Sequence, residues 1–332
     1  MEQQNGGVLS AGSEAVLTPF KTQGLATLQN FEEAGYLAGN SDIRAAVEAG
    51  EFPSGKAHFE TFGVHEGRQQ VFLRAIADAR AAKAERLRPM LRQDMPHIEN
   101  ENKFNFLTEA LREETRIINT LNVSENDYDG NAIALAERYK DGLLLDCGAG
   151  RRNVYYPNVV NFEIADYDTT DVLGVGEHLP FKDDSFDAVI SIAVLEHVRD
   201  PFRCAQEIAR VLKPGGELYC SVPFLQPLHG YPHHYYNMSH QGLKALFEDN
   251  LDILSQDVLP STAPIWSLTW FLSRWAEQLP DSIRKAFLSK TVGELVADPA
   301  SYLNEEWVTA LPKEAQFELA SATVLYARKP TL

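Results

Sequence analysis

The chain has few cysteines, 3 in 332 residues. Cys147, Cys204 and Cys220 lie in apolar stretches, with neither the pairing of a disulfide framework nor the spacing of a zinc site. This disfavours a disulfide-stapled secreted fold and a cysteine-ligated metal. We therefore expect reduced, buried thiols in a cytoplasmic protein.

The chain is also short of positive charge and of long apolar runs. Lys and Arg number 30 against 47 Asp and Glu, a formal net charge of -17, which argues against non-specific binding to nucleic acid or to an anionic membrane surface. The N-terminus lacks the basic start and apolar block of a secretion signal. The most apolar later stretch, residues 263–279, is too short and too polar to span a bilayer. We expect a soluble enzyme without an integral membrane segment and without a nucleic-acid partner.

The first quarter of the sequence is expected to fold apart from the rest. Residues 1–27 are polar, small and glycine-containing, which indicates a mobile tail. Residues 28–98 are predicted to form a helical accessory module, ending in a solvated linker helix over residues 69–88 that Pro89 stops.

Short motifs follow one another in this module: Tyr36-Leu37, Asn40-Ser41-Asp42-Ile43, His58-Phe59, Gly63, and Glu66-Gly67-Arg68. Their order resembles a small module found beside glycosyltransferases and other bacterial surface-polysaccharide enzymes. Ser41 stands where that module has proline, and Ile43 where it has valine. The alternative is a plain helical bundle in which His58 and His65 are structural.

Strands and helices alternate from residue 141 onward. The predicted strands are residues 143–147, 159–164, 171–175, 186–192, 218–222, 251–258 and 320–327. Helices are predicted over residues 103–120 and 132–140, and over residues 201–212, where Asp200 is a good N-cap and Pro201 suits the first position. This alternation predicts an α/β fold with a mostly parallel sheet.

The first two crossovers of this sheet are unusually short. Residues 148–158 separate the first two strands and residues 165–170 the next two, whereas a parallel crossover normally needs a dozen or more residues. The sheet would then lack part of its cover. We expect the N-terminal helices, or a second subunit of a homo-oligomer, to pack there.

Two motifs carry a resemblance to a known family. The strand at residues 143–147 breaks into Gly148-Ala149-Gly150, a turn that lets backbone amides approach a nucleotide-like ligand at the carboxyl edge of the sheet. A later helix ends in the run at residues 210–216. Together they resemble the class I methyltransferases that use S-adenosylmethionine, the type 11 group. The resemblance implies a Rossmann-like sheet of seven mostly parallel strands in a methyltransferase domain over residues 99–332.

The resemblance also implies which residues hold the cofactor. Asp146 and the glycine turn match the motif that approaches the amino acid part of S-adenosylmethionine. Glu163 matches the acid that binds the ribose hydroxyls, a task suited to a carboxylate because it can accept two donors. Val175 replaces an aspartate that contacts the adenine, so backbone groups nearby would serve instead. The expected cofactor site comprises Asp146, Gly148, Ala149, Gly150, Glu163, Glu177, His178 and Leu179.

The candidate catalytic residues lie after the fourth and fifth predicted strands. The run at residues 223–236 places His229, His233 and His234 at the functional edge of the sheet, and it resembles a subgroup of the family. His229 or His233 is the expected general base, and His197 is a further candidate beside the methionine part of the cofactor. Each could equally be structural. A metal pocket formed by His229, His233 and His234 is an alternative, but no metal is expected, because no Asp or Glu near these three residues in the sequence completes the ligand set.

All four tryptophans lie in an insertion at residues 261–317. Trp266, Trp270 and Phe271 recur at helical spacing, which is typical of core packing. The alternatives are a lid over the substrate or a surface that touches a membrane.

The predicted function is S-adenosylmethionine-dependent methyl transfer, most simply O-methylation of a small molecule or a glycan. A nicotinamide oxidoreductase is disfavoured, because Arg151, Arg152 and Asn153 follow the turn where a third glycine is needed. The other alternative is a catalytically silent scaffold of the same fold, acting in polysaccharide assembly.

Overall fold

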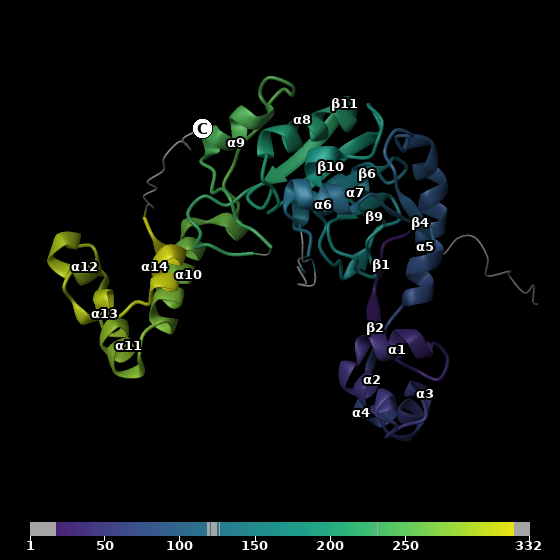
Figure 1. Cartoon of the computed structure of the whole chain (residues 1–332), viewed down its shortest axis with the longest axis horizontal. Helices are drawn as coiled ribbons and strands as arrows, with labels where there is room; N and C mark the ends of the chain where they lie inside the picture. Colours follow the sequence, from purple (N-terminus) through teal and green to yellow (C-terminus); the bar gives the residue numbers. More distant parts are fainter. Residues whose placement is uncertain (1–17, 118–119, 121–124, 126, 231, 322–332) are drawn as a thin grey trace, which may run out of the picture.

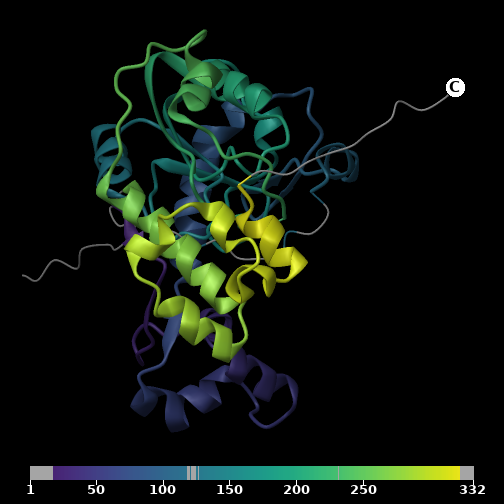
Figure 2. The same cartoon turned by 90° about the vertical axis from the view of Figure 1, so that its left-hand side faces the viewer.

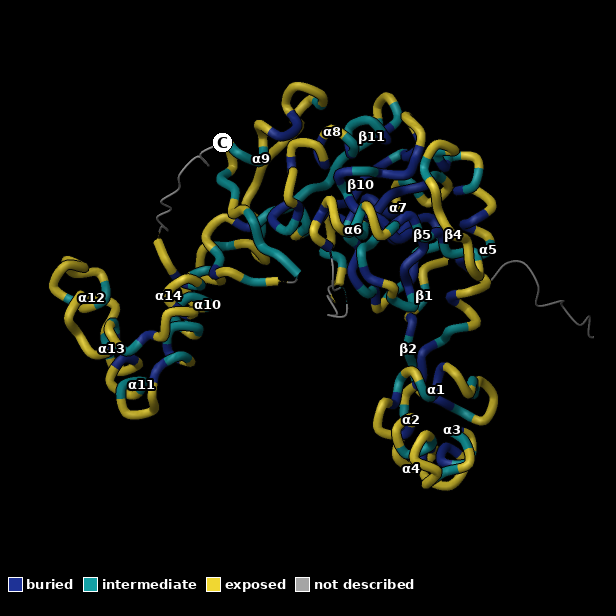
Figure 3. The backbone as a smooth tube through the Cα atoms, viewed as in Figure 1, coloured by how far each residue is buried: buried dark blue, intermediate teal, exposed yellow. Residues whose placement is uncertain are grey.

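The computed structural model describes residues 18–117, 120, 125, 127–230 and 232–321. An α/β domain lies between two smaller helical units, the N-terminal one in purple and the C-terminal one in yellow (Figure 1). Buried backbone concentrates in the sheet of the central domain, whereas most of the two outer units is exposed (Figure 3).

The central sheet has seven strands in the order β11-β10-β6-β8-β9-β5-β4. Only β4 is antiparallel to its neighbour, which confirms the predicted Rossmann-like, mostly parallel sheet. The strands are β4 (Ile98–Asn100), β5 (Lys103–Asn105), β6 (Leu144–Cys147), β8 (Val159–Glu163), β9 (Val172–Leu173), β10 (Phe186–Ile192) and β11 (Leu212–Ser221).

Two of the predicted elements were wrong in this region, the strand at residues 251–258 and the start of the helix at residue 103. Residues 251–258 form no strand, and residues 320–321 are not part of one, while residues 322–327 of that prediction lie outside the described residues. The hairpin β4–β5 supplies the two remaining strands instead. The helix predicted to start at residue 103 begins only at α6 (Glu109–Thr115), because Phe104 pairs with Val172 of β9 and is fully buried.

Alternate residues of the strands face opposite layers. Leu144 and Ile190 pack under α7 (Gly130–Arg138), whereas Leu143, Leu145 and Val189 belong to the larger core with α8 (Pro201–Val211) and α9 (His240–Phe247). The α8 start is as predicted, since the Asp200 side chain accepts from Arg203 N at 3.0 Å.

The short first crossover contains a strand rather than a helix. β7 (Val154–Tyr155) pairs antiparallel with β1 (Phe20–Lys21), and β2 (Gln23–Leu25) pairs with β3 (Gln69–Val71). Residues 20–21 and 23–25 therefore form strands rather than part of a tail, since β1 pairs with the crossover strand and β2 with β3. Residues 1–17 of the predicted tail lie outside the described residues.

Helix α5 (Leu73–Leu87) packs against this part of the sheet, as expected for the N-terminal helices. Its side chains donate to backbone carbonyls at or shortly before the start of three strands: Arg80 to Asp168, Lys83 to Val159 and Arg86 to Gly142. The helix thus runs along the amino-terminal ends of β9, β8 and β6. The prediction of a solvated helix was wrong for Arg80 and Lys83, which are buried.

A buried ion pair fixes α5 to the sheet. Lys83 Nζ lies 2.7 Å from Asp171 Oδ2, and both side chains are almost fully buried. Asp171 also accepts from Asn161 N at 2.8 Å and from the Tyr155 hydroxyl. Burial lowers the pKa of Lys83 to about 8, and the charge of Asp171 opposes this shift.

The N-terminal unit has its own small core of Ala26, Tyr36, Ile43 and Phe59. The Tyr36 hydroxyl lies 3.0 Å from His58 Nδ1, and a Cβ on Gly63 would come within 2.2 Å of that hydroxyl. His58 is thus a packing residue here. The helical segments are α1 (Glu33–Gly39), α2 (Ser41–Glu48), α3 (Gly55–His58), the π-helix η1 (Phe59–Gly63) and α4 (Val64–Glu66).

The C-terminal helices form a second small unit, seen in front of the central domain in Figure 2. Trp275, Phe287 and Trp307 pack together in its core. The core role predicted for the stripe of Trp266, Trp270 and Phe271 was wrong for Trp266, which is 59% exposed. The segments are α10 (Pro264–Glu277), α11 (Asp281–Leu288), α12 (Val292–Leu295), η5 (Pro299–Tyr302), α13 (Glu306–Thr309) and α14 (Lys313–Leu319). Within the described residues, no helix has the length and apolarity needed to traverse a bilayer.

Replacing Lys83 by Ala should lower the free energy of unfolding by about 3 kcal/mol or more, because the buried Asp171 carboxylate loses its nearest counter-ion. The matched control is Lys56→Ala, whose Nζ lies 3.7 Å from Glu60 at the surface and whose loss should cost no more than about 0.5 kcal/mol. Urea unfolding of both variants measures the difference, and equal losses would contradict a structural role for the Lys83–Asp171 pair.

Candidate active site

The glycine turn follows the carboxyl end of β6. Gly148 has φ +89° and Gly150 φ +63°, backbone conformations that glycine adopts without strain. A Cβ on Gly148 would lie 2.4 Å from Val194 Cγ2. Position 148 therefore favours glycine for two reasons: the backbone conformation of the turn, and the close approach of the chain that follows β10.

Asp146, the last but one residue of β6, lies fully buried beside the turn. Its Oδ2 accepts from Arg152 Nε at 3.0 Å and Nη2 at 2.6 Å, and from the Tyr128 hydroxyl. The Arg152 guanidinium also lies 4.1 Å from the centre of the Tyr128 ring. Among the described residues, Asp146 Oδ1 has no hydrogen-bond partner although it is buried. This oxygen is an acceptor available to a bound ligand.

Glu163 ends β8, the neighbour of β6 in the sheet. Its Oε2 accepts from Gly150 N at 2.7 Å and its Oε1 from Ile164 N at 2.7 Å. Burial raises the pKa of this carboxyl group, and the two backbone amides oppose the shift. The structure thus brings Glu163 to the glycine turn.

The side chains of the loop expected to reach the adenine differ in what they contact. Val175 is buried with Leu107 and Leu173, so its side chain is part of a core cluster. Glu177 and Leu179 are buried; Glu177 Oε1 accepts from Asp200 N at 3.4 Å, and Leu179 N donates to Glu207 Oε2 at 3.0 Å.

His178, in the same loop, lies between Arg203, 3.0 Å from its Nδ1, and Glu114, 3.3 Å from its Nε2. In this loop the side chains of Glu177 and His178 therefore already have protein partners.

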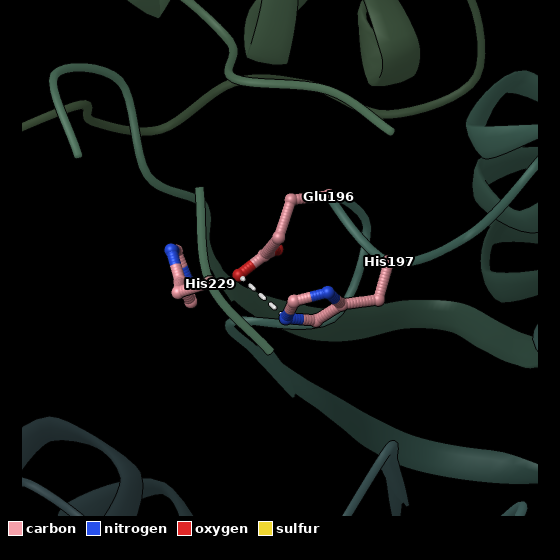
Figure 4. Close-up of side chains that lie close together, drawn as sticks. All are labelled: Glu196, His197 and His229. Carbon is pink, nitrogen blue, oxygen red and sulfur yellow. Dashed lines mark ion pairs between the residues drawn. The ribbon is translucent and has the colours of Figure 1, made fainter. Parts of the chain in front are cut away.

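A second group of polar side chains lies at the same edge, after β10. Glu196, His197 and His229 each offer one possible ligand atom, and these atoms lie within 4.8 Å of one another. Figure 4 shows the Glu196 carboxylate facing His197 Nε2, at 3.6 Å, with the His229 ring on the other side. Ala193, which precedes this turn, has φ +54°, a conformation that L residues rarely adopt and that clusters at functional sites.

The surroundings of these three residues shift their proton affinities. Burial raises the pKa of Glu196 to about 8 and lowers that of His197 to about 4. Burial also lowers the pKa of His229. Both Glu196 carboxylate oxygens are buried without a hydrogen-bond partner in the described part of the chain.

The loop after β11 folds over this cluster. Tyr235 N donates to Glu196 O at 2.7 Å, and a Cβ on Gly230 (φ +82°) would lie 2.2 Å from the His197 ring. Trp270 of α10 packs on His229, with ring centres 5.0 Å apart. The insertion therefore contributes an aromatic wall to the cluster.

The structure separates the predicted catalytic histidines. His197 and His229 join the cluster, but His233 Nε2 lies 2.9 Å from Arg116 O. His234 packs against both cluster histidines, with ring centres 5.4 Å from His197 and 4.5 Å from His229, while its Nε2 lies 2.9 Å from Asn237 Oδ1. Sequence reasoning missed Glu196 as their partner. A signal was available, since Glu196 adjoins His197 at the end of a strand, yet sequence distance hid its approach to His229.

An open, mostly parallel sheet with a glycine turn after one strand and an acid ending the next defines a nucleotide-cofactor-binding α/β domain. Residues 143–220 match the profile of the family described as methyltransferase domain. This part of the chain belongs to the class I methyltransferases, whose cofactor is S-adenosylmethionine.

Similar proteins match short stretches of this chain. An uncharacterised methyltransferase of Mycobacterium bovis is 48% identical over 50 residues, 15% of this chain and 20% of its own length. An uncharacterised protein of Methanocaldococcus jannaschii is 36% identical over 98 residues, 26% of this chain and 43% of its own. The chain thus spans less than half the length of these curated relatives.

Solved structures also match this chain, at low similarity. A methyltransferase of Thermotoga maritima described as a possible histamine N-methyltransferase is 20% identical, covering 36% of this chain and 70% of its own with a TM-score of 0.27. A phosphoethanolamine N-methyltransferase of Haemonchus contortus, solved with S-adenosylmethionine, is 18% identical. The match covers 55% of this chain and 48% of that protein, with a TM-score of 0.30.

Replacing Gly148 by Ala should lower the free energy of unfolding more than Gly215→Ala does. Both glycines have positive φ, at +89° and +77°, but a Cβ on Gly215 would meet nothing within 4 Å. Both variants should lose about 1 kcal/mol to backbone strain, and Gly148→Ala a further 1–3 kcal/mol, roughly, to the clash with Val194. Urea unfolding measures the two losses.

The double variant Gly148→Ala, Val194→Ala provides the check on this explanation. Removing the Val194 methyl groups makes room for the new Cβ, so the second substitution should recover part of the stability that the first one cost. Additive losses would show that the approach of Val194 is not the reason for glycine at position 148.

Proposed function

We propose that this protein transfers a methyl group from S-adenosylmethionine to an oxygen atom of a small molecule or glycan. The observation that carries the proposal is the shared position of two groups at the carboxyl edge of the sheet. The glycine turn meets Val194, and Glu196 and His197 follow two and three residues later. A cofactor at the turn and an acceptor at the cluster would therefore be neighbours.

The residues at the turn fit the cofactor chemically. Asp146 Oδ1, buried and without a partner among the described residues, suits a donor such as the cofactor's ammonium group. Gly148, Ala149 and Gly150 would approach its amino acid part, and Glu163 would accept from its ribose hydroxyls. Backbone groups of Glu177 and His178 would face the adenine, whereas the backbone of Leu179 is already bonded to Glu207 and Arg210. When bound, S-adenosylmethionine supplies an electrophilic methyl group on a sulfonium centre.

The contribution of the chain to the reaction is chiefly alignment, because methyl transfer needs donor and acceptor close and in line. A hydroxyl acceptor also has to lose its proton. The cluster of Glu196, His197 and His229 offers three acceptor atoms for this purpose. His233, which contacts Arg116 O, is the weaker candidate for the base.

The class of acceptor is proposed from two features. Trp270, which packs on His229, would give an acceptor bound at the cluster an apolar, aromatic neighbour. The motifs of residues 28–98 resemble a module that accompanies polysaccharide enzymes, which favours a glycan.

A catalytically silent scaffold in polysaccharide assembly is the second candidate. It is favoured by the Val175 side chain, which packs against Leu107 and Leu173 and offers no polar group to an adenine.

Isothermal titration with S-adenosylhomocysteine tests the proposal. The protein should bind this product, and Glu163→Gln should weaken binding about ten- to hundredfold, because it removes charge from hydrogen bonds to the ribose. The matched control is Asp166→Asn, an equal charge change three residues away on an exposed side chain, which should bind as the unaltered protein does.

Absence of binding by the folded protein would overturn the enzyme proposal and favour the scaffold. If the Glu163 and Asp166 variants bind S-adenosylhomocysteine equally well, the cofactor site is supported but Glu163 does not contribute to it. Once binding is established, transfer of a labelled methyl group to candidate hydroxyl compounds identifies the acceptor.

A further inference from the structure

Three proton-accepting atoms meet at the cluster of Glu196, His197 and His229 without a donor between them. Glu196 Oε1 lies 3.6 Å from His197 Nε2, too far for a hydrogen bond. Both oxygens of this fully buried carboxylate lack a hydrogen-bond partner in the described part of the chain. A buried carboxylate in such surroundings is costly unless a cation or a proton joins it.

The hydrogen bonds around the two rings assign their tautomers. Nδ1 of His197 lies 2.6 Å from His233 O, and Nδ1 of His229 lies 2.8 Å from Pro227 O. A carbonyl oxygen can only accept, so each Nδ1 carries the proton and each Nε2 keeps its lone pair. Backbone carbonyls that orient histidines in this way are typical of the surroundings of a metal site.

The ligand set indicates the kind of ion. Two neutral imidazoles and one carboxylate form the three-ligand set of catalytic zinc sites, which keep a further position open. Imidazole suits zinc and neighbouring transition metals, whereas magnesium and calcium prefer oxygen ligands alone. We propose that Glu196, His197 and His229 bind one divalent transition-metal ion, such as Zn²⁺, through a carboxylate oxygen and the two Nε2 atoms.

The loop and the helical insertion complete this site. Gly230 allows the loop to approach the His197 ring, and Trp270 packs on His229. Leu228 N, next to His229, donates to Glu318 O of α14 at 3.1 Å. The C-terminal helices thus help to position His229, whereas Glu196 and His197 lie in the turn that follows β10.

The use of the ion rests on the proposed methyl transfer, but its binding does not. A metal with an open position lowers the pKa of an oxygen that binds there. With the ion bound, the lone pairs of the cluster no longer serve as the base. A hydroxyl acceptor entering the open position would instead lose its proton to solvent more readily, and it would lie beside the cofactor site. The same cluster would then select acceptors that offer a metal-binding hydroxyl.

Titration of the tag-free, chelator-treated full-length protein with Co²⁺ alone tests the proposal. Binding to two histidines and a carboxylate should give the visible absorption bands of four- or five-coordinate Co²⁺ with a stoichiometry of one, and Zn²⁺ should abolish them by displacement. Glu196→Gln and His229→Ala should each lose the bands. The matched control His240→Ala, which removes an exposed histidine, should keep them.

Thermal unfolding of each variant verifies that a lost signal does not reflect a lost fold. Glu196→Gln keeps the shape of the side chain, so it tests metal binding even if His229→Ala disturbs the loop. Absence of the bands in the unaltered protein, or bands that persist in Glu196→Gln, would overturn the proposal.

Titration of the same samples with S-adenosylhomocysteine separates this proposal from the proposed function. Metal binding without binding of S-adenosylhomocysteine would support the metal site and refute the methyltransferase activity. Binding of S-adenosylhomocysteine without a cobalt signal would support the methyltransferase activity and refute the metal site.

Discussion

The parallel pairing of β6 with its two neighbours is the constraint on which the candidate site depends. Cys147 pairs with Phe162 of β8, and Asp146 with Ile190 of β10. Because parallel strands end at the same edge, this register brings the glycine turn, Glu163 and the turn containing Glu196 together from three separate parts of the sequence. A shift by one residue would turn each of these side chains toward the other face.

Local sequence signals predicted the parts of the fold that local interactions determine. The cap at Asp200, the glycine turn and the buried strands β6, β8 and β10 were all confirmed. Residues 251–258 have strand-like composition but form no strand, and β4–β5 was missed because its strands exist through pairing with β9, about 70 residues away. Propensity does not encode which edge of a sheet a distant hairpin will occupy.

The same distinction between local and long-range interactions applies to the candidate site. The motif around Asp146 and Gly148 could be found because its residues are neighbours in sequence and their spacing follows from one turn. The approach of Glu196 to His229 depends instead on how the loop after β11 folds back over β10. His233 was an equally good candidate by sequence, and only the backbone of that loop directs its ring to Arg116 O, away from the cluster.

The position of α5 alters where the chain can be divided. Its Lys83 is the counter-ion of Asp171, inside the α/β domain, although it lies upstream of the predicted boundary at residue 98. The helix is therefore energetically coupled to the sheet, and Val71 of β3 packs with Ile76 of α5 and Tyr155 of β7. A division of the chain at residue 98 would separate the buried Asp171 carboxylate from its counter-ion.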